Sequence, residues 1–195
     1  MRFIKAAPLL LVVALIAMAF VGTGSASAWG FCKKPEPECP EFLRYHVGQV
    51  FTGALETGTQ AHFTAGTEAI CKSSGFEDTL TTENGFLEGT MTLSMSSCNA
   101  TVAVVHQPWK TEHIAVEPGV WELRITSGGS GQPGFSISSC EYTAESIVLT
   151  LEDSSLTGGA PRAIANKELL TSSGCGSGVK GWTATYRESP NFYAG

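Results

Sequence analysis

The residues best suited to chemistry in this sequence lie in one short stretch between His106 and His113. The two histidines are seven positions apart, Pro108 and Trp109 lie between them, and Glu112 directly precedes His113. Imidazole and carboxylate groups can bind a metal ion or move protons, and an indole offers a stacking surface for a ligand. The spacing matches no known motif, so His106, Trp109 and His113 are weak ligand-binding candidates.

The sequence indicates no catalytic nucleophile. Ser130 and Ser177 lie among glycines, but neither completes the G-x-S-x-G turn that presents a catalytic serine. The adjacent carboxylates Glu77-Asp78 and Glu152-Asp153 would point to opposite faces of a strand, so they cannot flank one bond together. We expect both pairs at solvated strand ends and predict no catalytic residue.

Metal binding is not indicated either. The sequence has no C-x-x-C, and its four histidines have no zinc-finger spacing to a cysteine pair. Because Ile114 and Val116 share one face of a predicted strand, His113 should point outward with Thr111. We therefore interpret the histidines as surface residues and predict no metal and no cofactor.

The elements that must position these residues are strands. Apolar and polar residues alternate in several runs, and successive side chains of a strand point to opposite faces, so each run has one apolar face. The clearest runs are Met91–Ser96, Trp121–Thr126, Ile147–Glu152 and Trp182–Arg187. This pattern predicts antiparallel sheets covered on one side, with Trp121 and Trp182 in the core.

The intervening segments are rich in glycine and proline, as expected of turns. Asn84-Gly85 suits a tight type I′ hairpin, and Pro40–His46 is the one plausible short helix. The sequence therefore predicts an all-β domain, an antiparallel two-layer β-sandwich of about ten to twelve short strands. A closed β-barrel is the alternative.

Residues 1–28 have the parts of a cleavable secretory signal peptide. Basic residues near the N-terminus precede the apolar run Ala6–Val21, and small residues follow, with Ala26 and Ala28 at the positions that signal peptidase reads. The run has about 16 residues, fewer than the ~20 that span a bilayer as a helix. We predict cleavage after Ala28, a secreted or extracytoplasmic product, and no membrane span in the mature chain.

The charge of the mature chain limits its partners. It would keep 10 of the 12 basic residues and all 18 acidic ones, a net charge of −8. Nucleic acids and anionic membranes are bound by clustered lysine and arginine, so we exclude nucleic acid as a partner. We expect a monomer that binds an envelope or extracellular ligand.

The six cysteines all follow the predicted signal peptide, and in an oxidising compartment an even number favours disulfides. Cys32 and Cys39 bracket a proline-rich stretch and suit a local clip, so we divide the mature chain into a segment at 29–46 and one β-domain at 47–195. We expect the clip to tie down an exposed terminus without organising the core. The other four cysteines allow three pairings, of which we prefer Cys71 with Cys98 and Cys140 with Cys175.

Several runs of the chain resemble a large group of uncharacterised secreted proteins of high-GC soil bacteria. The similar runs are Cys71–Ser74, Leu93–Cys98, Gln107–Trp109, Thr126–Gly131 and Gly181–Tyr186, and the resemblance covers most of residues 50–188. It implies secretion and β structure and carries over no site, because the group has no established activity. The proline-rich Cys32–Cys39 opening departs from the group's pattern.

Together these features favour a secreted, disulfide-stabilised β-domain that acts as a non-catalytic binding or surface module of the cell envelope. The alternative is a secreted hydrolase that uses a histidine of the 106–113 stretch and a carboxylate. It requires His106 or His113 within hydrogen-bonding reach of Glu, Asp or Ser in a concave pocket. A protease inhibitor that presents the Cys32–Cys39 loop is a third option.

Overall fold

A computed structural model describes residues 31–36, 39–64, 68–82, 87–172, 175 and 179–194. The described part of the chain is all-β, with 63% of its residues in strands and 5% in helices, which confirms the predicted class. The predicted signal peptide and the Asn84-Gly85 hairpin lie outside the described residues.

Fourteen strands are assigned in the described part of the chain. They are β1 (Phe31–Cys32), β2 (Val50–Leu55), β3 (Ala61–Thr64), β4 (Ala69–Leu80), β5 (Leu87–Cys98), β6 (Val102–Val105), β7 (Trp109–Glu117), β8 (Val120–Thr126), β9 (Gly134–Ile137), β10 (Cys140–Thr143), β11 (Ser146–Glu152), β12 (Arg162–Ser172), β13 (Val179–Ser189) and β14 (Tyr193–Ala194).

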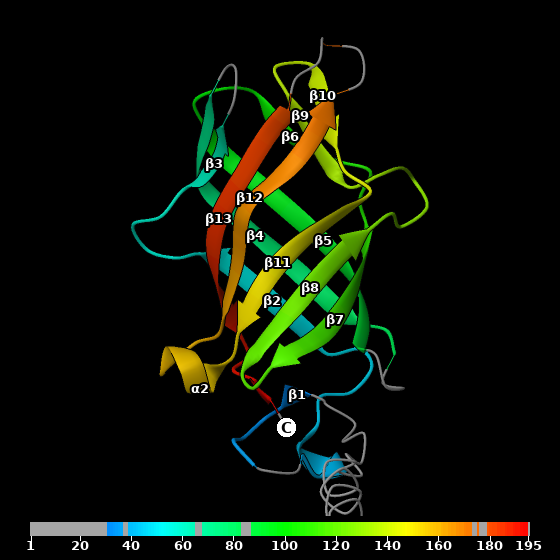
Figure 1. The fold of residues 1–195 in the computed structure, drawn as a ribbon, viewed down its shortest axis with the longest axis vertical. Helices are drawn as coiled ribbons and strands as arrows, with labels where there is room; N and C mark the ends of the chain where they lie inside the picture. The colour runs from blue at the N-terminus through cyan, green and yellow to red at the C-terminus, as the bar shows by residue number, and fades with distance from the viewer. Residues whose placement is uncertain are drawn as a thin grey trace, which may run out of the picture.

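Eight of these strands close an antiparallel barrel, so the chain adopts the barrel alternative (Figure 1). The order around the wall is β2, β4, β5, β7, β8, β11, β12 and β13, and β13 pairs with β2 to close the ring. The short strand β3 pairs with β13 and β4 beyond the end of β2. Closure removes the free sheet edges that a sandwich would keep.

The barrel interior is filled by the apolar faces that the alternation predicted. Trp121, Leu123 and Ile125 of β8 are buried, and Trp182 of β13 is fully buried. Strands that alternate in this way can cover one side of a single sheet that curls upon itself, just as they can cover two facing sheets. The periodicity therefore indicated strands without distinguishing the two architectures.

The upper end of the barrel in Figure 1 is closed by a small extension of the sheet. There β10 pairs with β12, β9 with β10, and β6 with β9. Phe135 of β9 lies in the core, with ring centroids 4.8 Å from Phe63, 5.0 Å from Trp182 and 6.1 Å from Trp109. An aromatic cluster thus fills this end.

The lower end is closed by a plug made of residues 31–36, 39–46 and 191–194. Here β1 pairs with β14 in a separate two-stranded sheet, next to the chain terminus marked in Figure 1. Phe31 is 2% exposed and Cys32 0%. The expectation that this segment would not organise the core was wrong, because Phe31 packs against Trp121 and Phe192 inside the barrel mouth.

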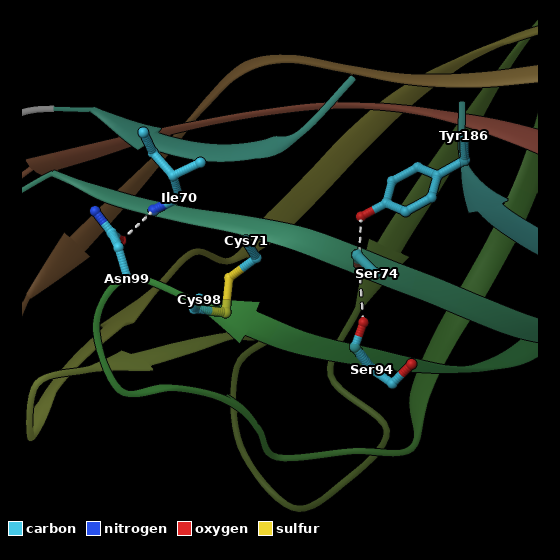
Figure 2. The surroundings of a disulfide bond; sticks show 7 residues. All are labelled: Ile70, Cys71, Ser74, Ser94, Cys98, Asn99 and Tyr186. Atoms are coloured by element: carbon cyan, nitrogen blue, oxygen red, sulfur yellow. Dashed lines mark hydrogen bonds between the residues drawn. A yellow bond between two sulfur atoms is a disulfide. The ribbon is translucent and has the colours of Figure 1, made fainter. Parts of the chain in front are cut away.

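The six cysteines form three disulfides, Cys32–Cys39, Cys71–Cys98 and Cys140–Cys175, which is the preferred pairing. Cys71 and Cys98 lie directly opposite each other on β4 and β5 (Figure 2). Beside them the Asn99 side chain accepts a hydrogen bond from the Ile70 amide at 2.7 Å. These links brace the wall between the two longest strands.

Two short helices complete the described structure. The 3-10 helix η1 (Glu41–Leu43) lies within the predicted helix at 40–46. The other, α2 (Ser154–Thr157), is capped by Asp153, whose carboxylate accepts from the amides of Ser155 and Leu156. Asp153 is buried as a helix cap, so its predicted place at a solvated strand end was wrong. None of the helices among these residues is long and apolar enough to cross a membrane.

Candidate functional site

The structure separates the three ligand-binding candidates of the 106–113 stretch. His106 lies at the surface with φ 58°, its Nδ1 atom 2.9 Å from the Gln132 carbonyl oxygen. Trp109 is fully buried and donates from Nε1 to the Val105 carbonyl at 2.9 Å. His113 points into the barrel. The stretch therefore does not form one site.

The predicted orientation of His113 and Thr111 was wrong. Both side chains are buried on the same face of β7 as Trp109, whereas Val116 is 58% exposed. The strand register shifts between Ala115 and Glu117, so the alternation does not run unbroken through Val116. By contrast, His62 is partly exposed on β3 and contacts the exposed Glu68 carboxylate, consistent with its predicted outward position.

His113 belongs to a polar cluster near the lower end of the barrel interior. Its Nε2 atom lies 3.1 Å from Oδ2 of Asp78 on β4, and the other Asp78 oxygen accepts a hydrogen bond from the Thr111 hydroxyl at 2.8 Å. The second ring nitrogen of His113 donates to the Leu87 carbonyl at 2.9 Å. His113 is 4% exposed and Asp78 1%. The expectation that Asp78 would be solvated was wrong, because its side chain is buried against His113.

The interior is shaped to hold this cluster. Gly89 of β5 is the residue opposite Thr111, and a Cβ atom there would lie 2.5 Å from both Asp78 Oδ1 and Thr111 Oγ1. Such a distance is far inside van der Waals contact, so no larger residue fits without a shift. Glycine at this position leaves the space that the carboxylate occupies.

Glu188 of β13 adds a second carboxyl group to the cluster and is 4% exposed. Burial raises its pKa to about 8; the His113 charge opposes this shift and the Asp78 charge adds to it. Burial by itself would lower the pKa of His113, but the hydrogen bond and charge of Asp78, with smaller contributions from Leu87 and Glu188, raise it. Both raised pKa values favour the protonated forms, a positively charged His113 and a neutral Glu188.

The arrangement has acid–base groups within reach of one another but closed to solvent. Phe31 covers His113 edge-on, with ring centroids 4.9 Å apart, and Phe192 packs against Phe31 at 4.4 Å. The hydroxyl of Thr111 is already engaged by Asp78. Asp78, His113 and Glu188 are at most 4% exposed, so the hydrogen-bonding half of the hydrolase requirement is met without an exposed cluster.

A separate hollow of 540 Å³ lies on the outer wall over β2, β4 and β5, lined in part by the outward residues of the wall. Thr52, Glu77 and Thr92 are register neighbours and form one row across the three strands. Ala54, Gly75 and Ser94 form the next row. We call this hollow the outer groove.

The strands beneath the outer groove are closely packed. A Cβ atom at Gly75 would lie 2.9 Å from the Gly53 carbonyl oxygen, so the two backbones approach closely there. On the inner side of the same wall, the Tyr186 hydroxyl lies 2.9 Å from Ser74 Oγ, which donates to the Ser94 carbonyl at 2.9 Å (Figure 2). The Cys71–Cys98 disulfide lies further along the same two strands (Figure 2).

No protein-family model matches the chain, and no curated protein or solved structure matches it. The resemblance to secreted proteins of soil bacteria therefore stays a prediction. No group of three or more His, Cys, Asp or Glu side chains in the described part of the chain could hold a metal ion.

Sequence reasoning missed Asp78 and Glu188, although the alternation contained the signal. Asp78 falls between Phe76 and Leu80 on the inward face of β4. In the same way Glu188 continues the inward series of Trp182, Ala184 and Tyr186 on β13. A carboxylate in phase with an apolar face predicts a buried charge that requires a partner.

Proposed function

We propose that this protein is an exported, non-catalytic binding module whose ligand contacts the outside of the barrel. The observation that carries the proposal is the filled interior. Aromatic clusters occupy both ends, and the His113–Asp78 pair is covered by Phe31. A barrel of eight strands can hold a small ligand only when its core is left open.

Export is supported by two independent features. The first 28 residues read as a cleavable signal peptide, and all six cysteines beyond it form disulfides, which persist in oxidising compartments. The mature product would begin near Trp29 and act as a monomer in the cell envelope or the medium.

The chemistry of the outer groove favours a hydroxyl-rich ligand such as an envelope polysaccharide. The Thr92 hydroxyl can donate and accept hydrogen bonds, and the Thr52 hydroxyl, which donates to the Ser189 carbonyl at 3.4 Å, can still accept. The Glu77 carboxylate between them accepts from ligand hydroxyls. The absence of a side chain at Gly75 lets a ligand approach the backbone. The acidic charge of the mature chain is compatible with a neutral or amino-bearing sugar.

A binding experiment with mature protein tests this proposal. Residues 29–195 would be applied to a glycan array and to purified cell-wall polysaccharide, with Thr92→Val as the groove variant. Thr90→Val is the matched control, since Thr90 lies on the same strand but is not among the residues that line the groove. We expect retention of the wild type and the control and weaker binding of Thr92→Val. Absence of retention on every envelope component, or equal loss in both variants, would refute the proposal.

A hydrolase remains the second candidate because His113 does lie within hydrogen-bonding distance of a carboxylate. It requires that the plug move to admit substrate. Turnover of chromogenic ester, glycoside or peptide substrates that disappears in His113→Gln, while the variant keeps its fold, would favour this candidate over the binding module.

A further inference from the structure

The polar cluster of Asp78, His113 and Glu188 is enclosed by the barrel wall at its sides and by the plug at the lower mouth, and the two are held by different interactions. Around the cluster the barrel wall is a continuous ring of hydrogen-bonded strands. The lower mouth is closed by the plug. Its strand β1 pairs with β14, and residues 31–33 form backbone hydrogen bonds with residues 43 and 45, which also belong to the plug. The hydrogen bond from the Ser154 amide to the Phe192 carbonyl and the packing of Phe31 against Trp121 connect the plug to the rest of the described structure.

The cluster under the plug receives titratable groups from three wall strands. Asp78 comes from β4, His113 from β7 and Glu188 from β13, and Tyr186 lies next to Glu188 on the same inward face. The plug itself carries two phenols, Tyr45 and Tyr193, and the pKa of Tyr45 is raised by burial and by Tyr193. In the described structure, His113 is the only basic side chain that pairs with these carboxylates.

This composition makes the closed state sensitive to rising pH. Glu188, with its pKa raised to about 8, becomes a second buried carboxylate beside Asp78 as the solution turns alkaline. As the pH rises through the raised pKa of His113, this side chain loses the proton that faces Asp78. Two buried carboxylates without a counter-charge are strongly unfavourable, and hydration relieves them. Water can enter through the mouth with far less disruption than through the hydrogen-bonded wall.

We propose that the plug is a pH-sensitive lid, which detaches from the lower mouth as the solution turns alkaline and admits water to Asp78, His113 and Glu188 while the barrel wall stays closed. The lid is independent of ligand binding at the outer groove. The plug is therefore a switch built around Phe31, whose ring covers His113 when the lid is closed.

The Cys32–Cys39 disulfide provides a direct readout of the lid. Both cysteines are buried in the plug, at 0% and 6% exposure, so a water-soluble phosphine reaches their bond only when the plug opens. The rate of reduction would be measured from pH 6 to pH 9 by alkylation and peptide mass mapping. Cys140–Cys175, which is not buried, serves as the reference in the same molecule.

We expect the rate ratio of Cys32–Cys39 to Cys140–Cys175 to rise by up to roughly tenfold per pH unit between pH 6 and 8 and to level off above that. The ratio for Cys71–Cys98 should stay constant, because Cys71 is buried in the wall and the wall remains closed. A constant ratio for Cys32–Cys39, an equal rise for Cys71–Cys98, or loss of the sheet signal in circular dichroism at pH 9 would each overturn the proposal.

Two matched variants assign the response to the cluster. Glu188→Gln keeps the shape of the side chain and removes its ionisation, so the rise should shrink to the part that His113 contributes. Glu168→Gln is the control, because Glu168 is a half-buried carboxyl of β12 whose pKa is also raised by burial but which accepts from the Val148 amide away from the plug. It should behave as wild type. A full rise in Glu188→Gln would exclude the cluster as the sensor.

Discussion

His113 and Asp78 form an ion pair that spans a strand. The two residues belong to β7 and β4, which are separated in the wall by β5, yet His113 Nε2 and Asp78 Oδ2 lie 3.1 Å apart. Gly89 of β5 leaves the space that the Asp78 carboxyl group and the Thr111 hydroxyl occupy. The pair thus connects three neighbouring strands from the inside of the barrel, in the layer directly beneath the plug.

Removal of one member of this pair should destabilise the protein strongly. Asp78→Asn leaves the His113 charge buried without a partner, and breaking a buried ion pair from one side typically costs about 3–5 kcal/mol. Urea unfolding of the mature protein measures the change. Glu77→Gln, one residue away on the outward face, should alter the free energy of unfolding by no more than about 0.5 kcal/mol.

The double variant Asp78→Asn/His113→Gln refines this prediction. If the two residues are coupled as the geometry indicates, the double variant will lose less stability than the sum of the two single variants. Additive losses would show that His113 and Asp78 act independently despite their proximity.

Thermal stability should fall between pH 6 and pH 9. The pKa of Glu188 is raised from its ordinary value to about 8, so its contribution is complete below about pH 4.5 and declines as the pH rises to 8. The raised pKa of His113 acts in the same direction, with a contribution that is complete below about pH 6.5 and is lost as the pH rises through the raised value. Melting curves by circular dichroism should show a lower Tm at pH 9.

In Glu188→Gln the difference in Tm between these two pH values should shrink, because one of the two contributions is absent. Each kcal/mol of lost stability lowers Tm by about 2–4 °C for a chain of this size. An equal Tm at pH 6 and pH 9 in the wild type would contradict the inferred protonation states.

Much of the fold could be predicted from the sequence, and the polar interior could not. Alternation identified the strands that carry Trp121 and Trp182, because burying one face of a strand requires that pattern in any all-β fold. Closure into a barrel depends on which distant strands meet, such as β2 with β13, and no local pattern encodes that pairing. Cysteine spacing suggested the disulfides without deciding among three pairings.

The predicted exposure was wrong where polar residues occupy inward-facing positions of a strand. Asp78 and His113 alternate in step with buried neighbours, but the residue type of each is typical of a surface. Their contact across β5 offsets the free energy cost of burying them. The 29–46 segment was predicted to be an exposed terminus because the partners of its Phe31, which are His113, Trp121 and Phe192, are distant in sequence. In both cases, burial depends on partners that are distant in sequence.

The Cys71–Cys98 disulfide should stabilise the barrel more than the Cys32–Cys39 clip. On the chain-entropy model, loops with sequence separations of 27 and 7 residues gain about 3.5 and about 2.5 kcal/mol. Urea unfolding of the two double-alanine variants measures both losses. A larger loss for Cys32→Ala/Cys39→Ala would mean that the plug contributes more to global stability than its loop length predicts.

Gly89→Ala should destabilise the protein through the space reserved for the polar cluster. The added Cβ would lie 2.5 Å from Asp78 Oδ1 and Thr111 Oγ1, and both atoms belong to buried side chains with little freedom to move. Overpacking of this kind costs about 1–3 kcal/mol. Gly159→Ala is the matched control, because nothing lies within 4 Å of its Cβ position, and it should leave stability nearly unchanged. Equal stability of the two variants in urea would show that the cluster can shift to admit a methyl group, which would argue against a tightly held His113–Asp78 pair.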